Sequence, residues 1–181
     1  MTPTAHIETD DIAEKIMQVC LRRELSIVAA ESLTGGLLAD AFVRVPGASR
    51  VFLGSVVTYD IRAKASILGV DAELLRSEGA VHPEVARQMT VGAASLYAGV
   101  GDVSHIISLS TTGVAGPGPD GIHPAGEVYI AISLPDDSSQ ELKRPSASTH
   151  VKRLQLEGSR QHIRELTVWN VLTTLAGLIE G

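Results

Sequence analysis

Three short polar segments hold the residues whose types and spacing could do chemistry. The first is Ala-Glu-Ser-Leu-Thr-Gly-Gly at 30–36, between a short apolar run and a helical pattern. A strand that ends in a small glycine-rich turn exposes backbone N–H groups, which can bind an anion or the developing oxyanion of acyl transfer. Ser32 would lie at the carboxyl end of this strand, where open α/β sheets place their ligands. The commoner alternative is structural: Thr34 caps the helix, and Gly35 and Gly36 permit a tight turn.

The second segment, Thr-Tyr-Asp-Ile-Arg-Ala-Lys at 58–64, could supply a base for a serine nucleophile. Tyr59 ends a predicted strand and Lys64 lies one turn into the next predicted helix, so both would face the same edge of the sheet as Ser32. A lysine whose pKa is lowered by burial can act as the general base, as in serine–lysine hydrolases. The alternative is that Lys64 is a solvated helix charge and Tyr59 a half-buried strand end, because most lysines are exposed.

The third segment, residues 111–121, is a glycine- and proline-rich loop that follows an apolar strand pattern. Thr112 and Gly113 lie at its start, and the loop is too rich in glycine to be held by its own side chains. Free backbone donors in such a loop could cradle a phosphate. An ordinary surface loop is an equal alternative, although long loops are more often functional than short ones.

Composition argues against several other classes of protein. Cys20 is the only cysteine and the six histidines show no ligand spacing, so neither an internal disulfide nor a metal site is expected. A net charge of −6 and an aromatic content of 3% argue against nucleic-acid binding. No apolar run approaches the roughly 20 residues that span a bilayer, and residues 1–11 do not resemble a signal peptide. We therefore expect a cytoplasmic protein that needs no metal ion or other cofactor.

Strand and helix patterns alternate along the chain. The predicted strands span 25–30, 51–59, 103–110 and 127–134, with one or two more within 143–156. The predicted helices lie near 12–20, 37–42, 61–68, 71–76, 83–96 and 159–175. Asp11 and Glu14 form a capping box that would start the first helix. This order predicts one domain over residues 1–181, an α/β/α sandwich of three layers with a mixed, mostly parallel sheet.

Taken together, the three segments resemble the C-terminal domain of the competence-damage-inducible protein CinA, a family of nicotinamide mononucleotide deamidases. The family pattern A-E-S-C-T-G-G resembles residues 30–36, with Leu33 where cysteine is usual, and V-T-Y-x-x-x-x-K resembles residues 57–64. The pattern T-G-I-A-G-P-x-G, followed by P-x-G-x-V, resembles residues 112–128. The family's G-D-R appears at 158–160, with Ser159 in place of the aspartate. The likeness covers nearly the whole chain.

The resemblance implies an amidohydrolase that converts nicotinamide mononucleotide and water to nicotinic acid mononucleotide and ammonia. In the matching positions Ser32 would be the nucleophile, Lys64 its base, and Tyr59 a hydroxyl that orients or relays between them. The expected substrate-binding residues are Thr34, Gly35, Gly36, Thr112, Gly113 and Arg160, the last because a guanidinium suits a phosphate. The resemblance further implies a stand-alone member of the family and a homo-oligomer, acting on a small nucleotide rather than on nucleic acid or a membrane.

Two other functions remain open from the residues alone. One is a serine–lysine amidohydrolase that acts on a different small amide. The other is a non-catalytic nucleotide-binding member of the family, suggested by the serine at 159. Ammonia release from a series of small amides separates the first of these from deamidation of nicotinamide mononucleotide. A thermal shift with nucleotides but no ammonia release would indicate the second.

Overall fold

The computed structural model of the protein describes residues 3–100, 102–135 and 148–180. The elements in chain order are α1 (Pro3–Arg22), β1 (Ser26–Glu31), α2 (Leu37–Val43), a 3₁₀ turn (Ala48–Arg50), β2 (Phe52–Val57), α3 (Ile61–Leu68), α4 (Ala72–Ser77), α5 (Pro83–Leu96), a second 3₁₀ turn (Val103–His105), β3 (Ile106–Gly113), β4 (Glu127–Ser133), β5 (Thr149–Gln155) and α6 (Arg160–Glu180). The part of the predicted strand region at 143–147 lies outside the described residues.

The five strands form one mixed sheet in the order β2-β1-β3-β4-β5. β1 is parallel to both β2 and β3, whereas β4 is antiparallel to its neighbours β3 and β5. Four strands therefore run in one direction, which confirms the predicted mixed, mostly parallel sheet. Glu31 at the end of β1 pairs with Thr111 near the end of β3. Ser32 and the loop after β3 consequently start side by side.

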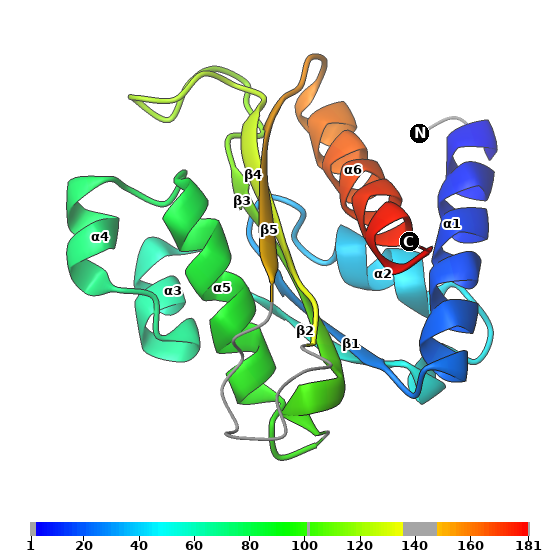
Figure 1. Cartoon of the computed structure of the whole chain (residues 1–181). Coiled ribbons are helices and arrows are strands. Elements are labelled where there is room, and N and C mark those ends of the chain that lie inside the picture. Colours follow the sequence, from blue (N-terminus) through cyan, green and yellow to red (C-terminus); the bar gives the residue numbers. More distant parts are fainter. Residues whose placement is uncertain (1–2, 101, 136–147, 181) are drawn as a thin grey trace.

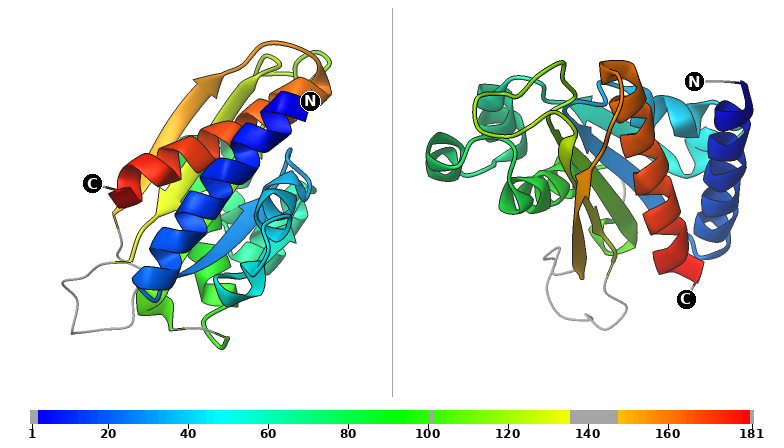
Figure 2. Two further views of the ribbon diagram at one scale, coloured as in Figure 1. Left: turned by 90° about the vertical axis from the view of Figure 1, so that its right-hand side faces the viewer. Right: turned by 90° about the horizontal axis from the view of Figure 1, so that it is seen from above.

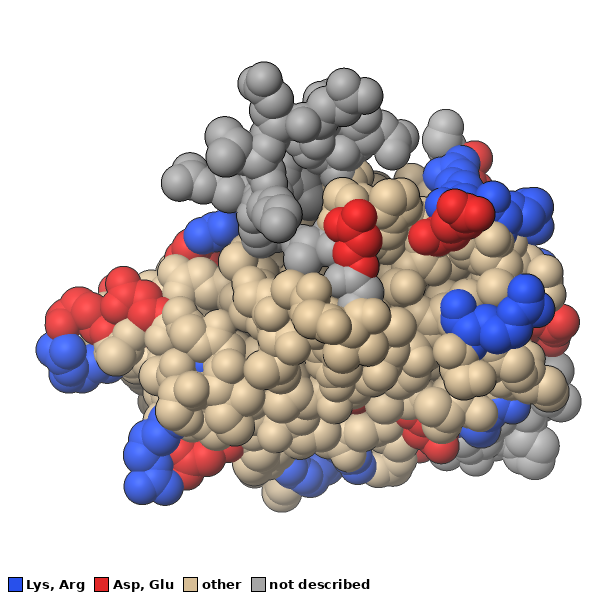
Figure 3. All heavy atoms as spheres, turned by 90° about the horizontal axis from the view of Figure 1, so that it is seen from below, with Lys and Arg blue, Asp and Glu red and all other residues tan. Residues whose placement is uncertain are grey.

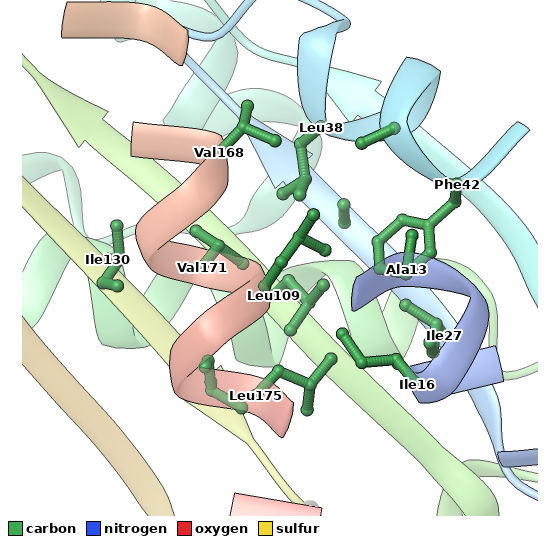
Figure 4. Close-up of a cluster of buried hydrophobic side chains, with 14 of the residues drawn as sticks. Ala13, Ile16, Ile27, Leu38, Phe42, Leu109, Ile130, Val168, Val171 and Leu175 are labelled. Carbon is green, nitrogen blue, oxygen red and sulfur yellow. The ribbon is translucent and has the colours of Figure 1, made fainter. Parts of the chain in front are cut away.

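Helices cover both faces of the sheet, as Figure 1 shows: α1, α2 and α6 on one face, and α3, α4 and α5 on the other. The larger core lies under the first group, and Leu38 and Phe42 of α2, Leu175 of α6 and Ile27 of β1 belong to it (Figure 4). Each fully buried side chain of this kind stabilises the fold by roughly 1.5–3 kcal/mol. The observed layers confirm the predicted α/β/α sandwich.

Strand β2 contains an irregularity that sets its register against β1. The partner of Ile27 is Phe52, but the partner of the next residue along β1 is Gly54, so Leu53 is an extra residue in β2. Such a β-bulge bends the strand and changes which side chains face each side. Gly54 has φ 152°, and a Cβ at this position would lie 2.4 Å from the hydroxyl oxygen of Tyr97, so the bulge requires glycine.

Most predicted elements are found within about three residues of their expected bounds, and the main correction concerns α1. This helix begins at Pro3, so Asp11 and Glu14 lie inside it rather than at its N-terminus. Proline fits the first turn of a helix, and residues 4–10 contain no glycine or proline to stop one. The capping-box pattern was therefore a wrong start signal. β3 also begins later than predicted, at Ile106, because Val103–His105 form the 3₁₀ turn.

Two opposite sides of the molecule differ in what they carry. The view from above in Figure 2 shows the loop after β3 and the start of α6 on the same side. Figure 3 shows the opposite side, where acidic and basic side chains are scattered mainly around the rim of an uncharged centre. The described residues on this side form no continuous basic surface of the kind that binds a phosphate backbone. Among the described helices, none is long and apolar enough to cross a membrane.

Candidate active site

Ser32 and Lys64 contact each other at the carboxyl edge of the sheet. Ser32 directly follows β1, and Lys64 lies one turn into α3, the helix that follows β2. The Lys64 Nζ donates to the Ser32 Oγ at 2.9 Å and also to the backbone carbonyl of Thr58. Lys64 has no exposed surface and Ser32 is 8% exposed. The alternative of a solvated lysine is therefore wrong, and the two residues form a buried pair.

Burial changes the proton affinity of this lysine. Loss of hydration lowers the pKa of Lys64 from 10.5 to about 8, and the nearby carboxylate of Asp60 acts in the opposite direction. At pH 7 about a tenth of the Lys64 side chains is then uncharged, compared with well under a thousandth for a lysine with the ordinary pKa. An uncharged amine within hydrogen-bond reach of a hydroxyl can take its proton, which is the requirement for a general base.

A carboxylate that the sequence analysis did not consider shapes the turn after Ser32. Glu31 is fully buried, and its two carboxylate oxygens accept hydrogen bonds from the backbone N–H groups of Gly36, Leu38 and Ala39 at 2.9–3.1 Å. They also accept the hydroxyl of Ser55 at 2.9 Å. The Glu31 carboxylate thus caps the N-terminus of α2, although Glu31 lies five residues before Gly36 in the sequence. A glutamate just before a glycine-rich turn is the signal that could have indicated this role.

In the predicted glycine-rich turn, the Thr34 hydroxyl and the backbone N–H groups of Gly35 and Gly36 already have protein partners. The Thr34 hydroxyl is 2.8 Å from that of Thr111, the Gly35 N–H donates to the Ser32 carbonyl, and the Gly36 N–H donates to Glu31. The expectation that the amides of Gly35 and Gly36 are free to hold the substrate is therefore wrong. Thr34 does not cap α2 either, because Glu31 does. Both glycines have positive φ, 54° and 96°, which the tight turn requires.

Tyr59 is placed differently from its expected role. Its side chain is 61% exposed, and its hydroxyl accepts a hydrogen bond from the Arg160 Nη2 at 2.6 Å. Within the described residues, neither Ser32 nor Lys64 hydrogen-bonds to this hydroxyl. A relay between nucleophile and base does not fit this geometry. Tyr59 instead lies with Arg160 at the mouth of the site, where Arg160 also donates to the carbonyl of Gly116.

A pocket of about 320 Å³ adjoins the Ser32–Lys64 pair. This volume is at the lower end of the range of small-molecule sites. Among the described residues, Arg160 is the one cation in its lining and Asp120 the one acid. The remaining lining comes from Ser32, Leu33, Tyr59, Ala80, Val81 and the loop residues 112–119. The structure therefore brings five predicted site residues to one pocket: Ser32, Tyr59, Thr112, Gly113 and Arg160.

Thr112 and Gly113 have structural contacts as well as a place in the pocket wall. The Thr112 hydroxyl donates to the carbonyl of Ala80 at 2.7 Å. Gly113 has φ 154°, and a Cβ there would lie 2.5 Å from the Glu127 carbonyl oxygen, so no other residue fits. In the described ranges, no three acidic, histidine or cysteine side chains are arranged to hold a metal ion.

Comparison with known proteins identifies the family. The family model of the CinA C-terminal domain matches residues 9–179. The chain belongs to this family.

Relatives and solved structures agree with this assignment. A CinA-like protein of Desulfotalea psychrophila is 36% identical over 169 residues, covering 93% of this chain and 37% of that protein. A CinA-like protein of Frankia casuarinae is 35% identical over 172 residues, covering 95% of this chain and 36% of that protein. The chain thus spans less than two fifths of these curated relatives. The crystal structure of competence/damage inducible protein CihA from Agrobacterium tumefaciens is 30% identical with a TM-score of 0.78, covering 94% of each chain.

Leu33 and Ser159 depart from the CinA pattern, and the structure accommodates both. Leu33 is 3% exposed and packs in the larger core, where an apolar side chain suits the site at least as well as a thiol. The Ser159 hydroxyl accepts from the backbone N–H of His162 at 3.2 Å, which is the contact of a helix N-cap. Serine and aspartate cap helices about equally well. The start of α6, which carries Arg160, is therefore maintained.

Proposed function

We propose that the protein hydrolyses the carboxamide of nicotinamide mononucleotide to nicotinic acid mononucleotide and ammonia. The observation that carries this proposal is the 2.9 Å contact between Ser32 and a fully buried Lys64 beside a pocket lined by Arg160. Membership of the CinA family supports the choice of substrate. The buried pair supports amide chemistry, because a serine hydroxyl needs a neighbouring base to become a nucleophile.

The proposed reaction proceeds in two halves through an ester on Ser32. Uncharged Lys64 takes the Ser32 proton as the hydroxyl oxygen bonds to the carboxamide carbon, and the carbonyl electron pair moves to oxygen. When the carbonyl re-forms, the C–N bond breaks, Lys64 gives the proton to nitrogen, and ammonia leaves. Water then gives a proton to Lys64 while its oxygen bonds to the ester carbon. Collapse of this second intermediate releases the acid, and the proton returns to Ser32.

Ammonia release from the purified protein tests this function. We expect nicotinamide mononucleotide to give ammonia and nicotinic acid mononucleotide in equal amounts, and to be preferred over nicotinamide, asparagine and glutamine. A preference for another of these amides would indicate a different amidohydrolase. Stabilisation by nucleotides in a thermal-shift assay with no ammonia release would indicate a binding protein. Either result contradicts the proposal.

The pH dependence of the reaction is expected to follow the proton on Lys64. Since only the uncharged amine can accept the serine proton, kcat/KM should rise about tenfold per pH unit below a midpoint near 8, the pKa of Lys64. Replacing Asp60 by asparagine removes the charge that raises this pKa, so the midpoint should fall by a few tenths of a pH unit. Asparagine still caps α3 as Asp60 does through the N–H of Arg62.

A pH profile of kcat/KM for the wild type and for Asp60→Asn measures this effect. Thermal unfolding of both proteins controls for damage to α3. A midpoint that stays in place or moves upward in Asp60→Asn would show that Lys64 is not the titrating base.

The 5′-phosphate of the substrate is expected to be required. Arg160 uses two of its five N–H donors on Gly116 and Tyr59, so others remain for a phosphate. A charge-assisted hydrogen bond contributes about 1.5–3 kcal/mol, so losing two such contacts should lower kcat/KM by roughly two to four decades. Nicotinamide riboside should therefore be a far poorer substrate than the mononucleotide, and Arg160→Ala should remove most of this preference.

Kinetics of both substrates on wild type and Arg160→Ala check this prediction. Arg76→Ala is a matched control, because Arg76 is an exposed arginine of α4 that pairs with Glu73 away from the pocket. Equal kcat/KM for riboside and mononucleotide on the wild type would show that Arg160 holds no phosphate.

A further inference from the structure

Two successive backbone N–H groups of buried residues, immediately after Ser32, have no acceptor in the part of the chain that the structure describes. Leu33 is 3% exposed and Thr34 is fully buried. The amides on either side are all bonded: Ser32 N–H donates to the Thr111 carbonyl, and Gly35 N–H donates to the Ser32 carbonyl. No group within the described ranges accepts from the N–H of Leu33 or Thr34. Buried amides without a partner are rare in folded proteins, so two in succession beside a nucleophile indicate a place for a ligand atom.

The carbonyls of the same two peptide units are held in place by other groups. The Ser32 carbonyl accepts from Gly35, and the Leu33 carbonyl accepts from the Arg164 Nε at 2.8 Å. In a trans peptide the C=O and N–H point in opposite directions. The Leu33 N–H therefore points away from Gly35, and the Thr34 N–H points away from Arg164. Successive N–H groups in a turn, with their carbonyls directed elsewhere, form a concave site for an anion.

Arg164 is the side chain that holds this turn. It lies in α6, and it reaches two successive carbonyls, those of Leu33 through Nε and Thr34 through Nη2 at 2.7 Å. A guanidinium is planar, stays charged at any relevant pH, and has its donors in a fixed fork. Arg164 fits this task better than a lysine could. A Cβ at Gly35 would lie 3.5 Å from the Arg164 Nη2, an ordinary contact, so the positive φ of 54° and not the lack of space favours glycine there.

We propose that the N–H groups of Leu33 and Thr34 form the oxyanion site of this enzyme and that Arg164 is its positioning residue. This inference rests on the proposed function. When Ser32 Oγ bonds to the carboxamide carbon, the C=O electron pair moves to oxygen and the serine proton moves to Lys64. The two amides then donate to the negative oxygen that has formed. A donor aimed at the developing charge accelerates such a step by about 10²–10³-fold.

The amide donors can be removed one at a time by backbone ester substitution. In vitro translation with the matching α-hydroxy acid replaces the N–H of Leu33, or that of Thr34, by an oxygen and keeps each side chain. We expect kcat to fall about 10²–10³-fold at each position, with KM within about threefold of the wild type. Esters at both positions that keep wild-type kcat would overturn the proposal.

An ester at Leu37 is the matched control in the same turn. The Leu37 N–H already donates to the Thr34 carbonyl at 3.1 Å, so its loss should weaken the turn without removing an oxyanion donor. We expect a lower melting temperature and a kcat close to that of the wild type. If the Leu37 ester lowered kcat as much as the Leu33 ester, the effect would come from the turn itself, and the oxyanion site would be withdrawn.

Arg164 is tested by its own variants and by chemical rescue. Arg164→Met should lower kcat by at least tenfold in protein that is folded by circular dichroism, and guanidinium ion at millimolar concentration should restore part of the loss. Arg164→Lys should recover less than guanidinium does, since an ammonium cannot bond both carbonyls in one plane. A purely structural role would lower the melting temperature and leave kcat of the folded fraction unchanged. That result would overturn the positioning role.

Acylation by an activated ester separates this proposal from the proposed function. Attack of Ser32 on p-nitrophenyl acetate creates the same negative oxygen without any nucleotide, and mass spectrometry reports acetyl-Ser32. We expect the backbone esters at Leu33 and Thr34 to slow acylation as they slow deamidation.

The outcomes for the two proposals differ. If the wild type is acylated but releases no ammonia from the mononucleotide, the proposed function fails and the oxyanion site stands. If the wild type deamidates the mononucleotide and the backbone esters at Leu33 and Thr34 leave kcat unchanged, only the oxyanion site is contradicted. A wild type that is not acylated at Ser32 overturns both.

Discussion

Replacing Ser32 by alanine is expected to lower ammonia release from nicotinamide mononucleotide by roughly 10⁴–10⁶-fold, the range seen when a serine nucleophile is removed. The fold should persist, because Ser32 is a small side chain in a turn that Glu31 caps and Arg164 holds. A steady-state ammonia assay with product chromatography measures the loss, and circular dichroism verifies the fold.

Ser77→Ala is the control for this experiment. Ser77 is an exposed serine of α4 whose hydroxyl donates to the carbonyl of Leu74 within its own helix, away from the pocket. Its loss should leave the rate within error of the wild type. A Ser32→Ala protein, purified free of wild type, that retained more than about a tenth of the activity would remove Ser32 from the mechanism.

Replacing Lys64 by methionine is expected to abolish the activity and to stabilise the protein. Without its base, Ser32 should lose nearly as much rate as it does in Ser32→Ala, and the double variant should be no slower than either single variant. Such non-additivity is the behaviour of residues that act as one unit. A double variant whose loss equals the product of the two single losses would show that Lys64 acts separately from Ser32.

The stabilising effect follows from the proton affinity of Lys64. Its pKa is about 8 in the fold and 10.5 in the unfolded chain, so below pH 10.5 the unfolded chain binds more protons. Stability therefore rises with pH between about 8 and 10.5, and below 8 the buried lysine destabilises the fold by roughly 3 kcal/mol. Lys64→Met removes this cost but also loses two hydrogen bonds, to Ser32 and to the Thr58 carbonyl. We expect a gain in unfolding free energy of about 1–3 kcal/mol at pH 7, and less at pH 10.5.

Urea unfolding at the two pH values measures this gain. Lys152→Met is the matched control, because Lys152 is an exposed lysine of β5 and its removal should change stability by less than about 0.5 kcal/mol. A loss of stability in Lys64→Met at pH 7 would show that the lysine is charged and well paired in the fold.

Local signals in the sequence were sufficient to predict most of the helices and strands. α3 was predicted over its observed bounds with Gly69 as its end, and Gly69 takes the left-handed conformation of a helix C-cap. The structure adds a cap at the start, where Asp60 accepts from the Arg62 N–H. The meeting of Ser32 and Lys64 was also predictable, because strand ends in a parallel sheet share one edge.

Contacts between distant segments could not be read in the same way. Arg164 reaches the turn after Ser32 from a helix about 130 residues further along the chain, and no local pattern marks it. The predicted relay through Tyr59 failed for a similar reason, since the tyrosine hydroxyl lies with Arg160 of the same distant helix. The substrate-binding amides were predicted to be those of Gly35 and Gly36, but the Gly36 N–H donates to Glu31. This could not be predicted locally, because the four contacts of Glu31 involve residues of both β2 and the start of α2.

The bulge in β2 makes the chain unequally tolerant of changes in length. Leu53 has no partner of its own on β1, so its deletion would leave each later residue of β2 opposite the partner that it has now. Deleting Ser55 instead would slide the end of the strand by one place, about 3.3 Å, and would turn its side chains to the opposite face. Thr58, whose carbonyl holds the Lys64 ammonium, would move with it. Insertions and deletions between Val43 and Phe52 leave this register intact, so natural length variation should accumulate in that connection and avoid residues 54–57 of β2.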